Sequence, residues 1–333
     1  MSKPTRRHHY VPQFYLREFA SDGQVHCVRL ENGARFNQSV SRAAMETDLY
    51  TLASHPDGPD VFEKAIASSI ETDASVALKQ MMHHGVRSIS FEQRVSISQF
   101  IALQAARGPE MSRTIAAIEG MAVRLEVGYG GRENVAKWVK SRLRTNITEE
   151  AAQALWDSVN KPADTKRKTA PEIHVHNMVH LLEQLWPYIM GRPWMLIRFT
   201  QRSLFTSDAP IGLVPSEEDL ENPFGGVGFA TAAGITVPLS RKMGLLLGDP
   251  MNIADLVDFE FVASGKADYN IKGTAAFAHL FNDHTAGSAS EWLFCHPDDA
   301  HLLPDPLPTQ KLVSIQMHGL PETFEERSPF ARD

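Results

Sequence analysis

The sequence predicts an α+β protein in which a mainly helical middle region packs with an antiparallel β-sheet, together with an N-terminal arm and a β-hairpin. Between residues 60 and 190, apolar side chains recur at the helical period, whereas β-prone runs separated by turn residues follow residue 191. The gaps between the first two and the last two of these runs are too short for crossover helices, which favours antiparallel pairing. With 43% hydrophobic residues in 333, the chain can form a sizeable core.

The first region, residues 1–58, holds an arm and a hairpin. The arm contains the sequence RRHHYVPQFYLREFA, in which two cations and two imidazoles precede an aromatic stretch. Two β-prone runs then surround Asn32-Gly33, a pair typical of hairpin turns. We expect a further short strand over 48–52, and the proline- and glycine-rich SHPDGPD places a boundary near residue 58.

Residues 59–190 form the predicted helical region. A helix is expected over 60–84, where Asp60 and Glu63 resemble a capping box, and a second helix begins at the Ser90/Gln93 pair. The sequence Arg107-Gly-Pro109 should interrupt that second helix, because proline lacks the amide that a helix interior needs.

The later elements include one more long helix and the sheet. Thr169 and Pro171 predict the start of a helix that reaches about Met190. Strands are expected within residues 191–300, with a final helix over about 264–283 and a returning strand over 291–295. Residues 301–333 are expected to form an irregular tail.

Charge and cysteine content exclude several classes of protein. The net charge of −7 opposes nonspecific coating of nucleic acid, so contact with a polyanion should be confined to the cation-rich segments 3–7 and 161–168. Cys27 and Cys295 alone cannot form a disulfide scaffold or a cysteine-rich zinc site. We find no secretion signal and no membrane-spanning run, so a cytoplasmic protein without membrane contact is expected.

The arm also carries a family resemblance. The motif HHYVPQFYLRxF resembles the opening of a bacterial family known as domain of unknown function 4238, and Arg107-Gly-Pro109 and Phe205-Thr-Ser-Asp208-Ala-Pro210 agree with it in order. The resemblance spans roughly residues 7 to 283. It implies a shared fold of arm, helical middle and later sheet, but no activity.

The adjacent imidazoles His8 and His9 are the sharpest chemical feature. One can serve as a metal ligand and the other as a general base, since imidazole titrates near neutral pH. The string resembles the first motif of His-Asn-His endonucleases, in which a histidine activates water and a metal takes the charge of the departing oxygen. The remainder of that motif is absent. Alternatively, the arm is an ordered structural segment anchored by its aromatic residues.

Two further residues are candidates for the same site. Asp208 lies where a strand meets a proline turn, which suits a metal ligand but equally a turn-stabilising carboxylate. Arg107 lies at the predicted helix break, where a guanidinium can clamp an anion or form an internal ion pair.

These residues support two hypotheses of different classes. The first is a metal-assisted hydrolase of a small-molecule phosphoester or a nucleic acid, with His9 as general base, His8 and Asp208 as ligands of a divalent metal ion, and Arg107 as anion clamp. The alternative is a non-catalytic binding or interaction module in which the HHYVP arm is a structural latch. The acidic net charge favours the second hypothesis mildly.

Overall fold

A computed structural model describes residues 6–161, 164, 166–221, 226–310, 321 and 323–327 of the chain. The chain folds into two compact units, one formed by residues 1–109 and 170–311 and the other by 110–169 and 312–333. Residues 3–5, 162, 163 and 165 of the two cation-rich segments lie outside the described residues. The predicted α+β class is confirmed, because helices and largely antiparallel sheets make up the first unit.

The long helices of the first unit agree with the predicted helical region. They are α2 (Val61–Ile66), α3 (Thr72–His84), α4 (Phe91–Ala106) and α8 (Pro171–Met190). Ser90 caps α4 with the predicted capping box, and α4 ends before Gly108-Pro109 as predicted. Helix α4 packs along α8 and against α3, and its inner side chains, including Phe100 and Leu103, are buried.

The predicted helix over 60–84 contains a π-helical turn. Residues Ala67–Glu71, labelled η2, join α2 to α3 through a wider helical turn. The predicted capping box at Asp60 is wrong, since Asp60 makes no side-chain cap bond and its Oδ1 accepts instead from Lys64 Nζ at 2.9 Å. Single π-helical turns occur frequently at functional sites, because they redirect the side chains around them.

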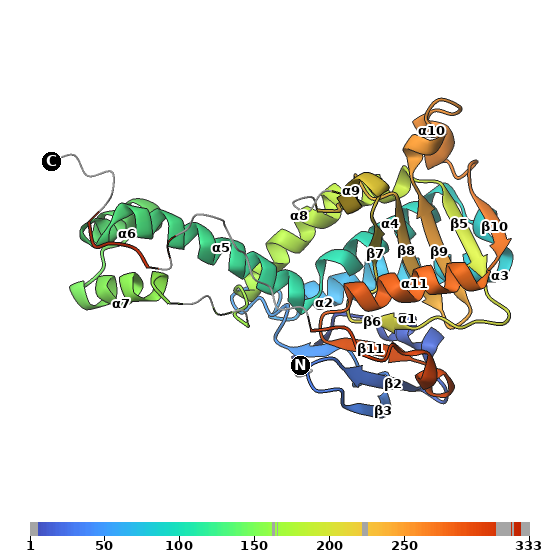
Figure 1. Cartoon of the computed structure of the whole chain (residues 1–333), viewed down its shortest axis with the longest axis horizontal. Helices are drawn as coiled ribbons and strands as arrows, with labels where there is room; N and C mark the ends of the chain where they lie inside the picture. The colour runs from blue at the N-terminus through green and yellow to red at the C-terminus, as the bar shows by residue number, and fades with distance from the viewer. Residues whose placement is uncertain are drawn as a thin grey trace. The chain divides into compact units, whose positions relative to one another are not determined.

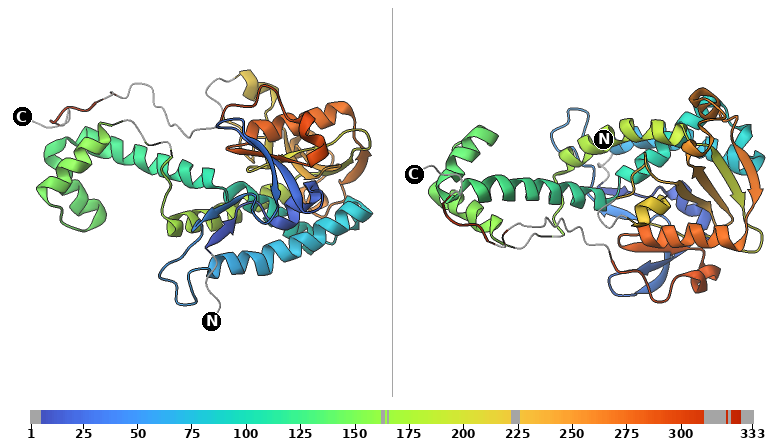
Figure 2. Two further views of the ribbon diagram at one scale, coloured as in Figure 1. Left: turned by 90° about the horizontal axis from the view of Figure 1, so that it is seen from below. Right: turned by 45° about the horizontal axis from the view of Figure 1, so that its top comes forward.

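A five-stranded sheet and its covering helices form the larger part of the core. The strand order is β10-β5-β9-β8-β7, with β5 at Trp194–Arg198, β7 at Gly212–Val214, β8 at Gly234–Ser240, β9 at Met243–Gly248 and β10 at Tyr269–Lys272. Helix α11 (Ala275–Ser288) crosses one face, and α3 and α4 lie on the other side (Figures 1 and 2). Phe281 of α11 packs so closely on Gly244 that a Cβ there would lie 2.5 Å from its ring.

The predicted final helix over 264–283 is wrong in its first half. Strand β10 pairs in parallel with β5, so the sheet is mixed where a purely antiparallel sheet was expected. A short helix, α10 (Phe259–Ala263), ends before Gly265, whose φ is +78°. Thr274 then accepts a bond from the Phe277 amide and begins α11 about ten residues later than expected. The cap at Thr274 and the left-handed glycine therefore separate two helices with a strand between them.

The second sheet joins the hairpin to strands from the C-terminal part of the chain. Its order is β3-β2-β11-β6, with β2 at Gln24–Arg29, β3 at Arg35–Ser39, β6 at Thr206–Ser207 and β11 at Trp292–Cys295. The hairpin and the returning strand are both confirmed, and every pairing is antiparallel. A 3₁₀ segment, η6 (Pro297–Leu302), follows β11.

The arm is ordered and paired from residue 7 onward. Strand β1 (Arg7–His9) pairs with β4 (Met45–Thr47) in antiparallel register, and helix α1 (Gln13–Leu16) follows. The predicted strand over 48–52 is wrong, because Asp48 adopts a φ of +59° that ends β4. Asp48 forms an ion pair with Arg6, which ties this turn to the beginning of β1.

The second unit has its own apolar core. Helices α5 (Pro109–Gly130), α6 (Val135–Leu143) and α7 (Glu149–Val159) bury a cluster around Val127, Trp156 and Val159.

The predicted N-cap at Thr169 is wrong by one residue: Ala170 precedes the first turn of α8, with Pro171 at its first position. Thr169 Oγ1 instead lies 3.4 Å from Glu119 Oε2.

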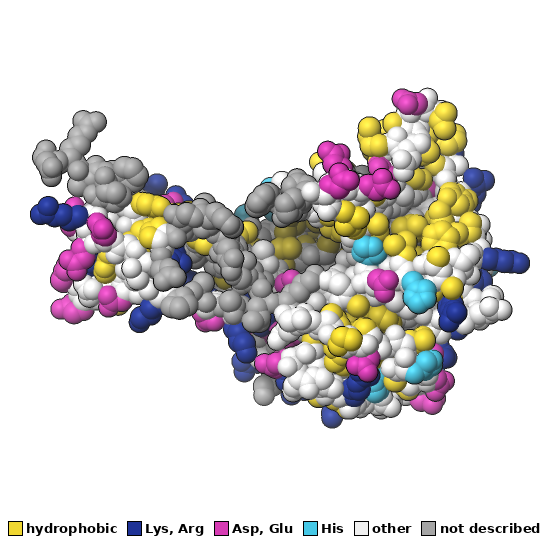
Figure 3. Space-filling view, viewed as in Figure 1, with side chains coloured by type: hydrophobic (Ala, Val, Ile, Leu, Met, Phe, Trp, Pro, Cys, Tyr) yellow, Lys and Arg dark blue, Asp and Glu magenta, His cyan; other side chains and the backbone are white. Residues whose placement is uncertain are grey.

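The surface of the first unit carries hydrophobic side chains on the connection between β9 and β10. Met251, Leu256 and Phe259 are each more than half exposed, and Figure 3 shows hydrophobic atoms over α10 and acidic atoms over the short helix α9 (Glu217–Glu221). No helix in the described ranges is long and apolar enough to cross a membrane.

The capping box of α4 should contribute measurably to stability. Replacing Ser90 with alanine removes the acceptor for the Gln93 amide, so Ser90→Ala should lower the free energy of unfolding by about 1 kcal/mol. Urea denaturation measures this loss. The control Ser96→Ala, in the same helix, should change stability by no more than about 0.5 kcal/mol; equal losses in both variants would contradict a capping role.

Candidate functional site

Arg107, at the end of α4, is the centre of the candidate site. Its side chain is fully buried, and its three polar groups contact three separate segments of the first unit. Nη1 lies 2.6 Å from Glu71 Oε1, Nη2 donates to the His9 carbonyl oxygen, and Nε lies 3.3 Å from the Tyr50 hydroxyl. The predicted candidates His9 and Arg107 are thus brought together, through the backbone of His9.

Tyr50 lies in a stack of three rings. The His8 ring is parallel to it within 4°, with ring centroids 5.4 Å apart, and the His174 ring lies 5.8 Å away on an 18° tilt. The Tyr50 hydroxyl donates to the Arg107 carbonyl oxygen at 2.8 Å, and His174 Nε2 lies 3.3 Å from the same oxygen. Tyr50 and His174 therefore satisfy a carbonyl that the break after α4 leaves without a helical partner.

The contacts of His9 define its tautomer. Nδ1 lies 3.1 Å from the Ala43 carbonyl oxygen, which can only accept, so Nδ1 carries the proton. Nε2 lies 3.1 Å from the amide nitrogen of Gln13, whose oxygen accepts from Arg17, and this second bond fixes the orientation of the amide. In the partly buried ring, the lone pair of Nε2 therefore accepts from the Gln13 amide. Burial is the main cause that lowers the pKa of His9, and the nearby Arg107 charge adds to the effect.

Glu63 is a carboxyl group that titrates near neutral pH. Burial, with a smaller contribution from the Glu71 charge, raises its pKa to about 7, although Arg107 and the His9 amide act in the opposite direction. Glu71 is already paired with Arg107, whereas the Oε2 atom of Glu63 is buried with no hydrogen-bond partner among the described residues. A protonated carboxyl and a neutral imidazole thus lie around one ion pair.

Asp208, at the end of β6, holds the beginning of β11. Its Oδ1 accepts from the Ser290 amide at 2.9 Å, and its Oδ2 accepts from the amides of Glu291 and Trp292 at 2.7 and 3.2 Å. These three charge-assisted bonds hold the beginning of β11 against the end of β6.

The proposed metal ligands are engaged in other contacts. The Nδ1 atom of the fully buried His8 accepts from the Tyr50 amide at 2.9 Å, so the neutral ring carries its proton on Nε2. A metal ion would have to displace that proton or that amide, and at Asp208 it would compete with three backbone donors. Within the described residues, no group of three or more His, Cys, Asp or Glu side chains is arranged to hold a metal ion. The metal site stays a prediction.

Four residues of the cluster were not identified from the sequence: Tyr50, Glu63, Glu71 and His174. Glu63 and Glu71 are eight residues apart, a spacing that places them on one face of a regular helix, and this was the available signal. Its functional meaning depends on Arg107, which lies 36 residues beyond Glu71, bonds to Glu71 and acts electrostatically on Glu63. Nothing local in the sequence indicates that contact.

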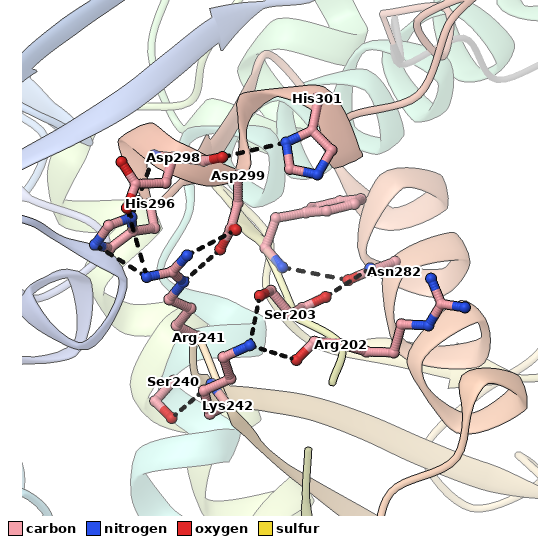
Figure 4. A network of polar contacts seen from close by, with 11 residues as sticks. Arg202, Ser203, Ser240, Arg241, Lys242, Asn282, His296, Asp298, Asp299 and His301 are labelled. Atoms are coloured by element: carbon pink, nitrogen blue, oxygen red, sulfur yellow. Dashed lines mark hydrogen bonds and ion pairs between the residues drawn. The ribbon is translucent and has the colours of Figure 1, made fainter. Parts of the chain in front are cut away.

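A second polar cluster joins η6 to the turn between β8 and β9. Arg241 donates to both oxygens of Asp299, at 2.6 and 2.9 Å, and its Nη1 lies 3.4 Å from His296 (Figure 4). Lys242 Nζ donates to the Ser203 hydroxyl at 3.0 Å and to the Arg202 carbonyl oxygen at 2.9 Å. Because these cations bond to the neighbouring loops, the cluster stabilises the ends of the two sheets.

The chain matches one family over most of its length. The family model described as protein of unknown function (DUF4238) matches residues 7–299, a range that includes every residue of the cluster around Arg107. No curated protein and no solved structure matches the chain significantly.

The raised pKa of Glu63 predicts a pH-dependent stability difference. Because the folded protein holds this proton up to about pH 7 and the unfolded chain releases it near pH 4.5, the Glu63 contribution to stability falls as pH rises between these values. Glu63→Gln lacks this titration. Its stability relative to the wild type should therefore rise by on the order of 2 kcal/mol across that interval.

Denaturant unfolding of both proteins at several pH values measures this difference. Glu92→Gln, which removes an exposed carboxyl from α4, is the control and should show no rise. A pH-independent difference between Glu63→Gln and the wild type would show that Glu63 titrates as an ordinary carboxyl.

Proposed function

Because this chain belongs to the DUF4238 family, whose function is unknown, its activity has to be inferred from the site, and we propose that it is a phosphoester hydrolase with His9 as general base and Glu63 as general acid. One observation carries the proposal. The neutral imidazole of His9 and the protonatable carboxyl of Glu63 lie around the buried Arg107–Glu71 ion pair, and neither is fully buried. The shifts reverse the usual order, so the carboxyl group keeps its proton at a pH at which the imidazole is neutral, as an acid and a base working together require.

The proposed step balances with the groups of the chain. Once the Gln13 amide has moved away from it, Nε2 of His9 takes a proton from water, and the water oxygen forms a bond to phosphorus. The bond from phosphorus to the ester oxygen breaks, and Glu63 gives its proton to that oxygen, so the products are an alcohol and a phosphate. Return of one proton from His9 and uptake of one by Glu63 restore the starting state. In this scheme Arg107 is a positioning residue, since its donors are engaged with Glu71, His9 and Tyr50.

The substrate phosphate would pair with Arg17. This exposed residue donates to Gln13 Oε1, and Gln13 in turn contacts Nε2 of His9. A phosphoester bound by the Arg17 guanidinium would therefore lie close to the general base, in reach of charge-assisted hydrogen bonds.

The two pKa values predict a bell-shaped pH dependence. The base requires a neutral His9, whose pKa is lowered, and the acid requires a protonated Glu63, whose pKa is about 7. Hydrolysis of the thymidine dinucleotide TpT, whose alkoxide leaving group needs a proton, should therefore rise as His9 loses its proton and fall above about pH 7. The initial rate from about pH 5 to about pH 9 measures the profile. In Glu63→Gln the falling limb should be absent, and an unchanged limb would contradict the assignment of the acid.

Removal of the base should abolish most of the activity. His9→Ala should lower kcat by about 100-fold or more with little change in KM, because general-base catalysis typically contributes that factor. The assay uses the same ester and single- and double-stranded DNA and RNA, each with EDTA, Mn²⁺ or Zn²⁺. His84→Ala, which removes an exposed histidine, is the control and should retain wild-type activity. Wild-type activity equal to that of His9→Ala under every condition would contradict the proposal.

A second candidate function is supported by a different observation. Arg107 and Asp208 direct their hydrogen bonds toward other segments of the chain, as expected of a structural latch in a non-catalytic interaction module. In that case His9→Ala and Glu63→Gln would alter stability without removing any hydrolysis. The combined stability and activity measurements therefore distinguish the two functions.

A further inference from the structure

The structure contains a cation-lined cavity separate from the Arg107 cluster. It has a volume of about 290 Å³ and lies between the segment Val86–Ser88, the first turn of α4 and the loop that follows α10. Its lining residues include three cations and one carboxyl group: Arg87, Arg94, Lys266 and Asp268. Such an excess of positive charge contrasts with the net charge of −7 of the whole chain.

We propose that this cavity binds the phosphate group of a small molecule. The proposal is independent of hydrolysis at His9, because no residue of the Arg107 cluster lines the cavity. A phosphate carries close to two negative charges at neutral pH and several acceptor oxygens, so it needs more than one cation with free N–H groups. The following contacts provide them.

Arg94 provides a buried, fixed charge. Its side chain is 2% exposed, it forms an ion pair with Asp268, and its guanidinium stacks on the Trp194 ring at 4.0 Å from the ring centroid. Nη2 donates to the carbonyl oxygens of Met190 and Arg192, at 3.2 and 2.8 Å, while Nε is buried with no hydrogen-bond partner in the part of the chain that the structure describes. An unpartnered donor of a buried charged group is costly, and an anion in the adjacent cavity would reduce that cost.

Arg87 and Lys266 provide exposed charge at the same cavity. Arg87 is held by two backbone bonds: Nε lies 2.6 Å from the Asp268 carbonyl oxygen and Nη2 lies 3.3 Å from that of Lys266. Its Nη1 makes no such bond to a described residue, so this arm of the guanidinium can donate to a ligand. Lys266 is exposed, and its ammonium, which carries three N–H donors, lies over the Phe261 ring, 5.8 Å from the centroid.

The backbone keeps the cavity open beside the ion pair. Gly265 has a φ of +78°, and a Cβ at this position would lie 3.1 Å from Asp268 Oδ2 and 3.5 Å from Arg94 Nη1. A side chain there would occupy the space next to the ion pair. Asp268 Oδ1 also accepts from the Trp194 amide at 2.8 Å, so the one carboxyl group of the lining is tied to β5 and paired with Arg94.

Isothermal titration calorimetry with inorganic phosphate, pyrophosphate and acetate tests the proposal on the full chain. We expect saturable binding of phosphate, tighter binding of pyrophosphate and no saturable binding of acetate. Lys266→Glu reverses one exposed charge and should weaken binding of phosphate by about tenfold. The matched control Lys272→Glu reverses an exposed charge on β10 outside the cavity and should change affinity by less than about twofold.

Arg87→Gln is a second variant that keeps the buried ion pair intact, and it should also weaken phosphate binding by about tenfold. Circular dichroism confirms that each variant is folded. Absence of saturable phosphate binding by the wild type, acetate binding as tight as that of phosphate, or equal affinities of Lys266→Glu and Lys272→Glu would overturn the proposal. Because His9→Ala leaves this cavity untouched, loss of hydrolysis with retained phosphate binding separates this inference from the proposed function.

Discussion

The buried charge of Arg107 is the constraint on which the centre of the first unit depends. Removing a guanidinium from water costs several kcal/mol unless partners surround it. Glu71, Tyr50 and the His9 carbonyl supply those partners from three segments that are far apart in sequence. The arm, the turn after β4 and the π-helical turn before α3 must therefore all be in place before this charge is satisfied. Burial alone would lower the pKa of Arg107, but Tyr50 and Glu71 together raise it, so the residue stays charged.

The same ion pair connects packing to the proposed chemistry. Arg107 neutralises Glu71, which leaves Glu63 as the carboxyl that burial keeps protonated, and its Nη2 bond to the His9 carbonyl positions the imidazole. The two residues beside this ion pair therefore have pKa values shifted in opposite directions: that of Glu63 is raised and that of His9 is lowered. The phosphate cavity repeats this organisation at a second place, where a buried arginine is paired with an acid beside exposed cations.

The elements that could be predicted from the sequence are those whose signals are local. The capping box at Ser90, the break at Gly108-Pro109 and the hairpin around Asn32-Gly33 were all confirmed, because each depends on residues within one or two turns. The strand β10 was missed, since its pairing with β5 depends on a distant segment of the chain. For the candidate site, the motif predicted the arm and the helix break predicted Arg107, and the structure brings the two together at the His9 carbonyl. Glu63 was taken for part of a capping box, because neighbouring residues do not show that the buried Arg107 charge acts on it.

The pKa of the Glu63 side chain decides whether this residue holds a proton that it can donate near neutral pH. An NMR titration with ¹³C-labelled glutamate follows the carboxyl carbon from about pH 3 to about pH 9, and Glu63→Gln assigns the resonance. Because the side chain is largely buried, we expect a midpoint of about 7, well above that of the exposed glutamates. A midpoint in the ordinary range near 4.5 would show that Glu63 is ionised at neutral pH and would contradict its role as the proton donor.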